Sequence, residues 1–241
     1  MGYLDYMGKI KESVLDFMYP GRLYCICCGN IINETRSYGL CDHCITHIRW
    51  EMEERELPLE GYETKLKLLK CTDYGIYERS IVFALKYDGH KYIAKEIAGI
   101  MKDRLTAGGY FEDVDTDNLL IVPVPLHESR LSERGFNQAE LIGRNLGNVL
   151  NAPIFDILER NRKTLPMKNL GPKERSRNIA GAISPKYPGE EMEGLVEGRD
   201  LLLVDDFYTT GSTAGECAKA LIEFKPRSIS AIVFASGKWI E

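Results

Sequence analysis

Residues 201–213 read Leu-Leu-Leu-Val-Asp-Asp-Phe-Tyr-Thr-Thr-Gly-Ser-Thr, and this stretch decides the fold. Its four apolar residues predict a strand that is buried on both faces, as in a parallel sheet. Asp205 and Asp206 follow at the carboxyl end of that strand, where open α/β sheets bind ligands. A helix is expected next, because apolar residues recur on one face. They are Ala214, Cys217, Ala218, Leu221 and Ile222.

The hydroxyl-rich turn between this strand and helix predicts a cradle for a phosphate monoester. Backbone N–H groups, hydroxyl groups and a helix N-terminus all favour a bound anion there. The residues of the turn are Thr209, Thr210, Gly211, Ser212 and Thr213. Because carboxylates repel phosphate, Asp205 and Asp206 need another part of the same ligand, and the vicinal hydroxyls of a ribose 5′-phosphate fit. The stretch resembles the phosphoribosyl-diphosphate (PRPP) signature of type I phosphoribosyltransferases.

Length and composition are those of an ordinary globular protein. The chain has 241 residues, 44% hydrophobic and 28% charged, enough for one medium domain with a small appendage or for two small domains. A net charge of -5 argues against a surface that coats nucleic acid, although not against a local basic patch. We expect a cytoplasmic protein without a membrane span or signal peptide, and a short amphipathic helix over residues 1–18.

Five of the seven cysteines are clustered near the N-terminus, which indicates a metal site rather than disulfides. Cys25, Cys28, Cys41 and Cys44 have the spacing C-x2-C-x12-C-x2-C of a zinc ribbon. Four thiolates would close a tetrahedral Zn2+ site without an open position, so the ion would be structural. Cys27 is then a surplus thiol, and His43 or His47 are alternative ligands.

The chain divides, on this interpretation, into two parts. Residues 1–60 are expected to hold the N-terminal helix, the zinc ribbon and a linker, which we place within 49–63 because this segment is acidic and contains proline and glycine. Residues 61–241 would form the second domain, with helices over 77–87 and 91–105 and a loop over 107–118. Further irregular connections are expected at 160–177 and 184–198, and a last strand at 228–235.

A second buried strand is predicted at Leu119–Val122, before two prolines and a polar segment over residues 128–138. A helix over 139–150 should follow. Each of the two buried strands is therefore followed by a polar loop that leads into a helix. In a parallel sheet both loops would rise from one edge and hold one ligand between them.

Several motifs together make the chain similar to the ComF family, whose members join an N-terminal zinc ribbon to a phosphoribosyltransferase-type domain. The motifs are Lys86-Tyr87-Asp88-Gly89, Pro123-Val124-Pro125-Leu126-His127, Arg134-Gly135-Phe136-Asn137-Gln138-Ala139 and Arg177-Asn178-Ile179-Ala180-Gly181-Ala182. The resemblance extends from Cys25 to Ala235. Met167 and Ile183 depart from it, because the family often has a glutamine and a bulky aromatic residue at those places.

The resemblance implies a type I phosphoribosyltransferase-like parallel sheet flanked by helices, with Asp205 and Asp206 as the catalytic pair. They would accept hydrogen bonds from the 2′ and 3′ hydroxyls of the ribose, and residues 209–213 would bind its 5′-phosphate. The pyrophosphate of PRPP would lie after Leu126, beside Arg130 or Arg134, since guanidinium groups pair bidentately with phosphate. Mg2+ would bridge the pyrophosphate and the ribose hydroxyls.

Three functions fit this interpretation. The first is transfer of phosphoribosyl from PRPP to an unknown nitrogen acceptor. The second is a non-catalytic role in DNA uptake and competence, with single-stranded DNA or a partner protein bound, and the third is PRPP sensing. The basic segment 160–177 would be either a lid over the site or a solvated loop. We expect His127 to lie in the loop near the pyrophosphate, Phe136 to anchor the core and Asn137 to cap a helix.

Overall fold

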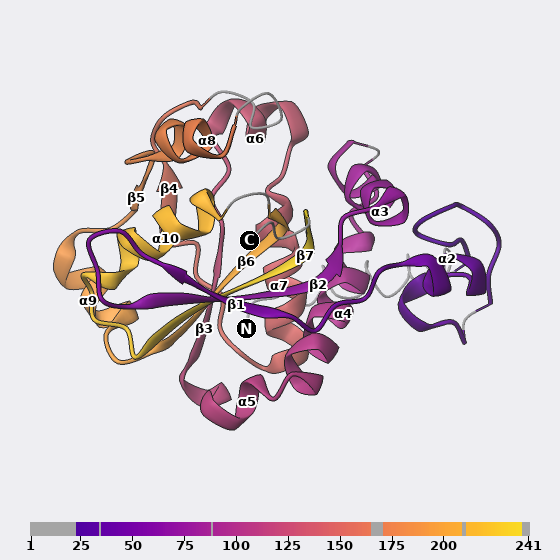
Figure 1. The fold of residues 1–241 in the computed structure, drawn as a ribbon, viewed down its shortest axis with the longest axis horizontal. Coiled ribbons are helices and arrows are strands. Elements are labelled where there is room, and N and C mark those ends of the chain that lie inside the picture. The colour runs from indigo at the N-terminus through magenta and orange to yellow at the C-terminus, as the bar shows by residue number, and fades with distance from the viewer. Residues whose placement is uncertain (1–22, 34, 88, 165–170, 209–210, 238–241) are drawn as a thin grey trace, which may run out of the picture.

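A computed structural model describes residues 23–237 except 34, 88, 165–170 and 209–210. Its centre is a mixed five-stranded sheet with the order β1-β2-β7-β6-β3 (Figure 1). The strands are β1 (Glu54–Pro58), β2 (Lys65–Asp73), β3 (Leu119–Pro123), β6 (Asp200–Tyr208) and β7 (Ser228–Ser236). Only β1 is antiparallel to its neighbour within this sheet. The helix expected over residues 1–18 lies outside the described residues.

The two strands that carry the predicted ligand loops lie side by side. β3 and β6 pair in parallel, with Val122 opposite Leu203 and Pro123 opposite Val204. Both strands are buried along their apolar stretches, as the continuous apolar runs predict for a sheet covered on both faces. Their carboxyl ends therefore meet at one edge, and the loops that follow them rise together as predicted.

Helices cover both faces of the sheet. One face holds α3 (Ile76–Tyr87), α4 (Ile93–Ala107), α5 (Tyr110–Asp113) and α7 (Gln138–Leu150). The other holds α8 (Pro172–Ile179), α9 (Gly189–Val196) and α10 (Ser212–Ile222). At the carboxyl edge lie α6 (Glu128–Arg134) and a small antiparallel sheet of β4 (Leu158–Arg160) and β5 (Ile183–Pro185) (Figure 1). A 3-10 turn, η2 (Thr116–Asn118), precedes β3. The predicted fold class is thereby confirmed.

Residues 23–48 form a small module, here called the cysteine module, at the far end of α3 and α4 (Figure 1). It contains the 3-10 turn η1 (Ser37–Gly39) and helix α2 (Asp42–His47). Its buried residues Ile26, Leu40 and Ile48 belong to the same apolar cluster as the inner faces of α3 and α4. The module is thus packed onto the sheet domain through a continuous core.

Several expected connections turn out to be regular elements. The segment expected to be a linker contains β1, which pairs with β2 at the edge of the sheet. Exposed and half-buried residues alternate along β1, as in a strand with one face toward solvent. Helices α6 and α9 replace the irregular structure expected at 128–138 and 184–198, and α8 replaces the end of that expected at 160–177, of which residues 165–170 lie outside the described residues. α8 and α9 contribute Ile179, Met192 and Val196 to the buried apolar cluster that also contains residues of the sheet and of α10. Tertiary packing of a few apolar residues outweighs the polar composition of these segments.

Candidate functional site

A pocket of about 280 Å³ lies at the carboxyl ends of β3 and β6. It brings together the predicted acidic pair, both predicted arginines and one residue of the predicted phosphate turn. The polar residues that line it are Lys86, Arg130, Arg134, Asn137, Gln138, Arg160, Asp205, Asp206 and Thr213. A pocket with two carboxylates and four cations is suited to a ligand that carries both hydroxyl groups and phosphate.

The acidic pair lies where β6 leaves the sheet. Asp206 is 4% exposed, and its Oδ2 lies 2.8 Å from Nζ of Lys86 on α3. Oδ1 of Asp205 accepts a hydrogen bond of 2.8 Å from the backbone N–H of Asp206. Burial, followed by the nearby charge of Asp206 and opposed by Lys86, raises the pKa of Asp205 to about 8. The pair therefore holds a strongly perturbed carboxyl group in a pocket, as ligand sites often do.

Three arginines face the pair from two elements. Arg130 and Arg134 come from α6, and Arg160 ends β4. Nη1 of Arg134 donates to Oε1 of Gln138 at 2.9 Å, and its guanidinium lies over the ring of Tyr87, 5.2 Å from the centroid. Burial and the charge of Arg130 lower the pKa of Arg160. A bound anion would relieve such crowding of like charges.

Three buried donors of this pocket have no acceptor within the described part of the protein. They are Nε of Arg134, Nε2 of Gln138 and Nε of Arg160. An unpaired buried donor costs about 1–3 kcal/mol, so three at one pocket call for acceptors from a ligand or from water. Phosphate oxygens would supply several acceptors at once.

The predicted phosphate turn is described only from Gly211 onward, and Thr209 and Thr210 lie outside the described residues. Gly211 has φ +81°, and a Cβ there would lie 2.8 Å from Cδ1 of Leu57 and against the hydroxyl of Tyr208. Glycine is therefore required at the start of α10. Thr213 lines the 280 Å³ pocket, whereas Ser212 lines a separate hollow that Leu57 also lines.

The loop after β3 places several of its polar residues in structural roles. His127 accepts a hydrogen bond from the N–H of Ser129 and caps α6, and it lines a different pocket from the acidic pair. Asn137 caps α7 by accepting from the N–H of Ala139, as predicted. Phe136 packs against the core and lies under Nζ of Lys91.

Sequence reasoning did not assign Lys86 or Arg160 to the site. The sequence indicates Lys86 only as part of a motif, because a lysine at the end of an amphipathic helix is an ordinary surface residue. Arg160 belongs to a segment expected to be a loop, and the pairing of β4 with β5 places it in the pocket. The sequence did indicate that a cation should lie near Asp205 and Asp206, because a buried acidic pair needs one, but not that the cation is Lys86.

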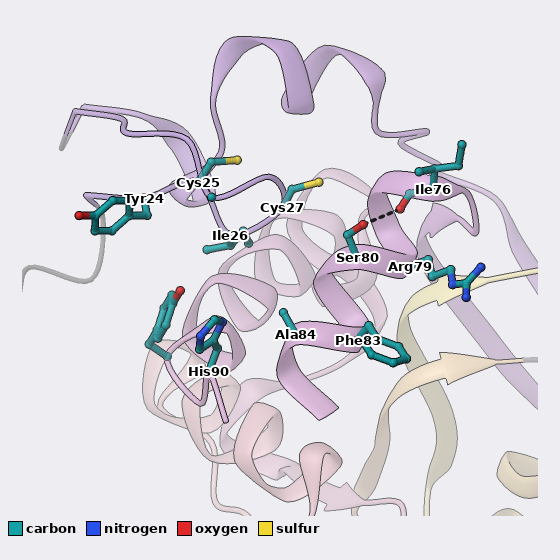
Figure 2. Close-up of a pocket in the computed structure, with 12 residues that line it drawn as sticks. Tyr24, Cys25, Ile26, Cys27, Ile76, Arg79, Ser80, Phe83, Ala84 and His90 are labelled. Atoms are coloured by element: carbon teal, nitrogen blue, oxygen red, sulfur yellow. Dashed lines mark hydrogen bonds between the residues drawn. The ribbon is translucent and has the colours of Figure 1, made fainter. Parts of the chain in front are cut away.

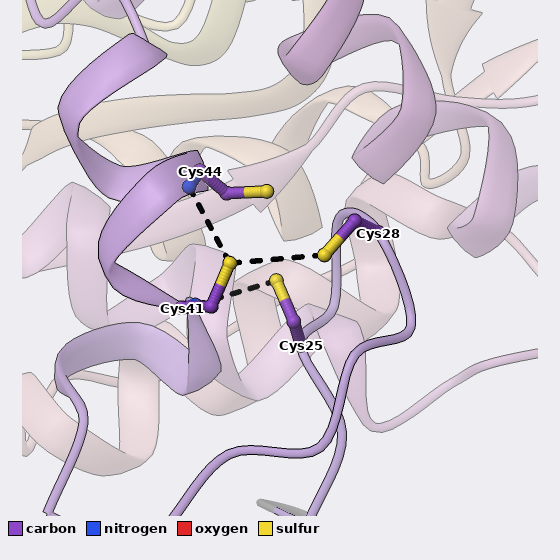
Figure 3. A group of neighbouring side chains, drawn as sticks. All are labelled: Cys25, Cys28, Cys41 and Cys44. Carbon is purple, nitrogen blue, oxygen red and sulfur yellow. Dashed lines mark hydrogen bonds between the residues drawn. The ribbon is translucent and has the colours of Figure 1, made fainter.

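The four predicted metal ligands converge in the cysteine module (Figure 3). The Sγ atoms of Cys25, Cys28, Cys41 and Cys44 all lie within 4.8 Å of one another. Tetrahedral zinc with bonds of about 2.3 Å needs sulfur atoms about 3.8 Å apart, and the Sγ atoms of Cys28 and Cys41 are 3.7 Å apart. Cys27 instead donates to the carbonyl of Tyr77 on α3. The cluster could hold one metal ion.

A larger pocket of about 750 Å³ opens between the cysteine module and α3 (Figure 2). Exposed aromatic rings lie around it, among them Tyr24, Phe83 and Tyr92. His90 and Arg79 add polar groups to its rim, and Arg79 is exposed. We call this hollow the aromatic pocket. Lys86, on the same helix, lines the 280 Å³ pocket instead.

Comparison with known proteins gives relatives that cover most of the chain. No family model matches it. It is 25% identical over 195 residues to competence protein F of Haemophilus influenzae. This match covers 80% of this chain and 83% of that protein. It is 30% identical over 162 residues to the DNA utilization protein YhgH of Escherichia coli, covering 65% of this chain and 66% of YhgH. A match to competence protein ComFC of Bacillus subtilis is 30% identical but covers only 39% of that protein.

Solved structures that match the chain include phosphoribosyltransferases. The HGPRT-ase of Leishmania tarentolae in complex with GMP has a TM-score of 0.34 and 14% identity, covering 63% of this chain and 73% of that one. Hypoxanthine phosphoribosyl transferase of Trypanosoma cruzi has a TM-score of 0.35 and 16% identity, covering 61% of this chain and 65% of that one. The fold assignment rests on the strand order and pairing of this chain alone.

Proposed function

Because this chain belongs to the ComF family, we propose that it binds PRPP with Mg2+ in the 280 Å³ pocket and transfers the phosphoribosyl group to a nitrogen acceptor. The observation that carries the proposal is the composition of this pocket. An acidic pair and three buried donors without acceptors among the described residues line it together. One ligand with vicinal hydroxyls and a diphosphate would satisfy both sets of groups.

The ligand would be oriented by the polarity of the pocket. Asp205 and Asp206 would accept hydrogen bonds from the 2′ and 3′ hydroxyls, while the turn at 209–213 would hold the 5′-phosphate against the start of α10. Arg130, Arg134 and Arg160 would then face the diphosphate. This placement assigns to Arg160 a role beside the two arginines that the sequence indicated.

The pocket fits a metal that arrives with its ligand. Apart from the acidic pair, its polar side chains are cations, amides and a hydroxyl, so Mg2+ would be held chiefly by oxygens of the ligand and by water. Mg2+ would supply charge neutralisation of the diphosphate as it leaves. The arginines would add to this stabilisation, which we expect to be the largest catalytic contribution.

The reaction is a displacement at C1 of the ribose. The bond between C1 and the diphosphate oxygen breaks, the diphosphate leaves with the electron pair, and the acceptor nitrogen forms the new bond to C1 and loses a proton. The transition state has oxocarbenium character, so exclusion of water matters. No covalent intermediate with the protein is required.

Release of pyrophosphate tests catalysis. We expect the wild-type protein to release pyrophosphate from PRPP and Mg2+ with at least one member of a panel of nucleobases and amines. The double variant Asp205→Asn with Asp206→Asn should lose about 100-fold or more of the rate. PRPP binding without release of pyrophosphate in the presence of any acceptor would favour a PRPP-sensing regulator over a transferase.

The aromatic pocket favours a second candidate function, binding of single-stranded DNA as an accessory of DNA uptake. Relatives are named for competence and for DNA utilization. Bases stack on aromatic side chains with little sequence preference, and Tyr24, Phe83 and Tyr92 offer such rings in a pocket that Arg79 also lines. The same face could instead contact a partner protein.

Fluorescence anisotropy with labelled oligonucleotides tests this candidate. Single-stranded DNA should bind more tightly than the duplex, with an affinity that falls as salt rises. Phe83→Ala should weaken binding about tenfold, because stacking of a base contributes about 1–3 kcal/mol. Equal loss in Phe155→Ala, which removes an exposed ring outside the aromatic pocket, would assign the effect to a cause other than stacking there.

We also propose that Cys25, Cys28, Cys41 and Cys44 bind one structural Zn2+. Support comes from the convergence of their Sγ atoms and from the packing of the module on α3. With four thiolates the ion would have no open position for substrate. Its contribution would be to fold a segment whose own apolar core is small.

A further inference from the structure

Lys86 reaches the acidic pair from a helix that belongs to a different part of the pocket wall. It lies in the last turn of α3, and its side chain is only 19% exposed. Its Nζ lies 2.8 Å from Oδ2 of Asp206, whose side chain is 6% exposed. An ammonium group in this position is shielded from solvent, so its attraction to the carboxylate is stronger than at the surface.

Two adjacent carboxylates in one pocket repel each other, and burial adds to the tendency to take up a proton. Asp205 and Asp206 are covalent neighbours joined by the hydrogen bond from the N–H of Asp206 to Oδ1 of Asp205. A protonated carboxyl group accepts hydrogen bonds poorly, whereas a ribose offers two hydroxyl donors. Ionisation of the pair is therefore a condition for binding the ribose in the proposed orientation.

Other charged or titratable groups face the pair from three elements. Arg160 comes from β4 and Arg130 and Arg134 from α6, and all three line the pocket, while the thiol of Cys217 on α10 interacts with Asp205. The arginines would be engaged by the diphosphate once PRPP is bound. Lys86 differs from them because it contacts the pair directly.

We propose that Lys86 is the internal counterion that favours the ionised form of the Asp205–Asp206 pair, the form that can accept the two hydroxyl groups of a ribose. The assignment rests on the proposed function for the identity of the ligand, but not for the ion pair itself. Lys86 is then a positioning residue, which acts on the ligand through the carboxylates. Lys86 contacts Oδ2 of Asp206, and Oδ1 of Asp205 accepts from the N–H of Asp206, so the two remaining carboxylate oxygens could accept from the sugar.

The first test is the titration of the pair in the ligand-free protein, followed by NMR of protein with ¹³C-labelled aspartate carboxyl groups. The Asp205→Asn and Asp206→Asn variants assign the signals. In Lys86→Met the titration of the pair should move to higher pH by about one unit, because an opposite charge at this distance lowers the pKa of a carboxyl group by about 1–3. Lys86→Arg should titrate like the wild type.

The second test is binding of ribose 5-phosphate between pH 6 and pH 9.5, measured by calorimetry. Lys86→Met should bind about tenfold more weakly than wild type at pH 7 and approach it at the highest pH. Lys86→Arg should follow the wild-type profile. Lys95→Met on α4, which removes an exposed lysine, is the matched control and should change neither profile.

The two tests separate the failures. An unchanged titration of the pair in a folded Lys86→Met protein would overturn the counterion assignment. A shifted titration, with no binding of ribose 5-phosphate by the wild type at any pH, would support the counterion assignment and overturn the proposed ligand. Equal weakening by Lys86→Met across the whole pH range would also overturn the assignment, since it would indicate a steric effect.

Discussion

At the scale of single residues, two adjacent aspartates have different environments. Asp206 forms an ion pair with Lys86, while Asp205 accepts a hydrogen bond from the backbone of its neighbour. Burial, with the charge of Asp206 adding to it, raises the pKa of Asp205 from 3.8 to about 8. A protein that keeps a buried carboxyl group with a raised pKa is less stable than it would be without it, as is common where binding needs charges close together.

Asp205→Asn should therefore stabilise the ligand-free protein. An aspartate in the unfolded chain loses its proton near pH 4, but folded Asp205 keeps it to about pH 8. The contribution of this group to stability is thus full below about pH 4 and falls as pH rises toward 8, by up to about 1.4 kcal/mol per unit. At pH 8 the variant should be more stable by about 2 kcal/mol, with a gain that shrinks toward pH 4.

Urea unfolding at several pH values measures this gain. The asparagine keeps an oxygen that can accept from the N–H of Asp206, so the local backbone need not change. A variant that is less stable than wild type at pH 8, or a difference that grows on acidification, would contradict burial and like charge as the origin of the raised pKa of Asp205.

At the scale of elements, one helix residue holds the edge of the sheet in place. Arg104 of α4 is 4% exposed, and its Nε donates to the carbonyl of Lys70 on β2 at 3.0 Å. Its Nη2 donates to the carbonyls of Met52 and Glu53, just before β1, at 2.9 and 3.1 Å. The guanidinium thereby ties the segment between the cysteine module and the sheet to α4.

Arg104→Met should destabilise the protein by about 3 kcal/mol, because the buried carbonyl of Lys70 and the partly buried carbonyls of Met52 and Glu53 would lose their donor. Thermal unfolding followed by circular dichroism measures the loss. Arg144→Met is the matched control, since Arg144 forms an exposed ion pair with Glu140 within α7, and such pairs contribute about 0.3–0.5 kcal/mol. Similar losses in both variants would contradict the role of Arg104 as a clamp.

The elements also show where sequence reasoning succeeds and where it does not. Apolar runs identified β3 and β6 and the edge at which their loops meet, because a doubly buried strand is recognisable locally. β2, which lies between β1 and β7, was missed although the lysines that alternate with leucines at its start are a strand pattern. Its later part includes the charged residue Lys70, which is buried beside Asp73 and breaks the apolar run. α8 packs against α10, which is distant in sequence, so its own composition could not reveal it. β1 pairs with β2, the next strand along the chain, but its segment is acidic and contains proline and was therefore interpreted as a linker.

At the scale of the whole molecule, the cysteine module and the sheet domain share one core. Ile26, Leu40 and Ile48 pack in the same cluster as α3 and α4. α3 in turn contacts the module on one side, through the carbonyl of Tyr77 and Cys27, and carries Lys86 into the 280 Å³ pocket. The division at residue 60 stays a prediction. The described helices include none long and apolar enough to span a membrane.

Loss of metal should therefore affect more than the module. Cys28→Ser should lower the zinc content from one ion per chain to well below one, and lower the melting temperature of the whole protein in a single transition. Cys27→Ser should keep the metal, because the thiol of Cys27 donates to the carbonyl of Tyr77 and is not one of the four proposed ligands. Elemental analysis with calorimetric unfolding measures both. An early, separate transition in Cys28→Ser, with the main transition unchanged, would contradict a shared core.

Prediction of the site from sequence was limited in the same way. The acidic pair could be chosen because it follows a recognisable strand, and Arg130 and Arg134 because the family resemblance places the pyrophosphate after Leu126. Lys86 and Arg160 could not, since α3 and β4 bring them to the pocket from positions distant along the chain. The ligand is thus better indicated than the acceptor, for which the sequence shows no matching pattern of side chains.

Isothermal titration with PRPP and Mg2+ tests the central claim most directly. We predict saturable binding of one PRPP per chain by the wild type. We also predict that the double variant Asp205→Asn with Asp206→Asn, shown to be folded by circular dichroism, binds at least about 100-fold more weakly. Absence of binding by the wild type, or undiminished binding by the double variant, would contradict the assignment of this pocket to a phosphoribosyl ligand.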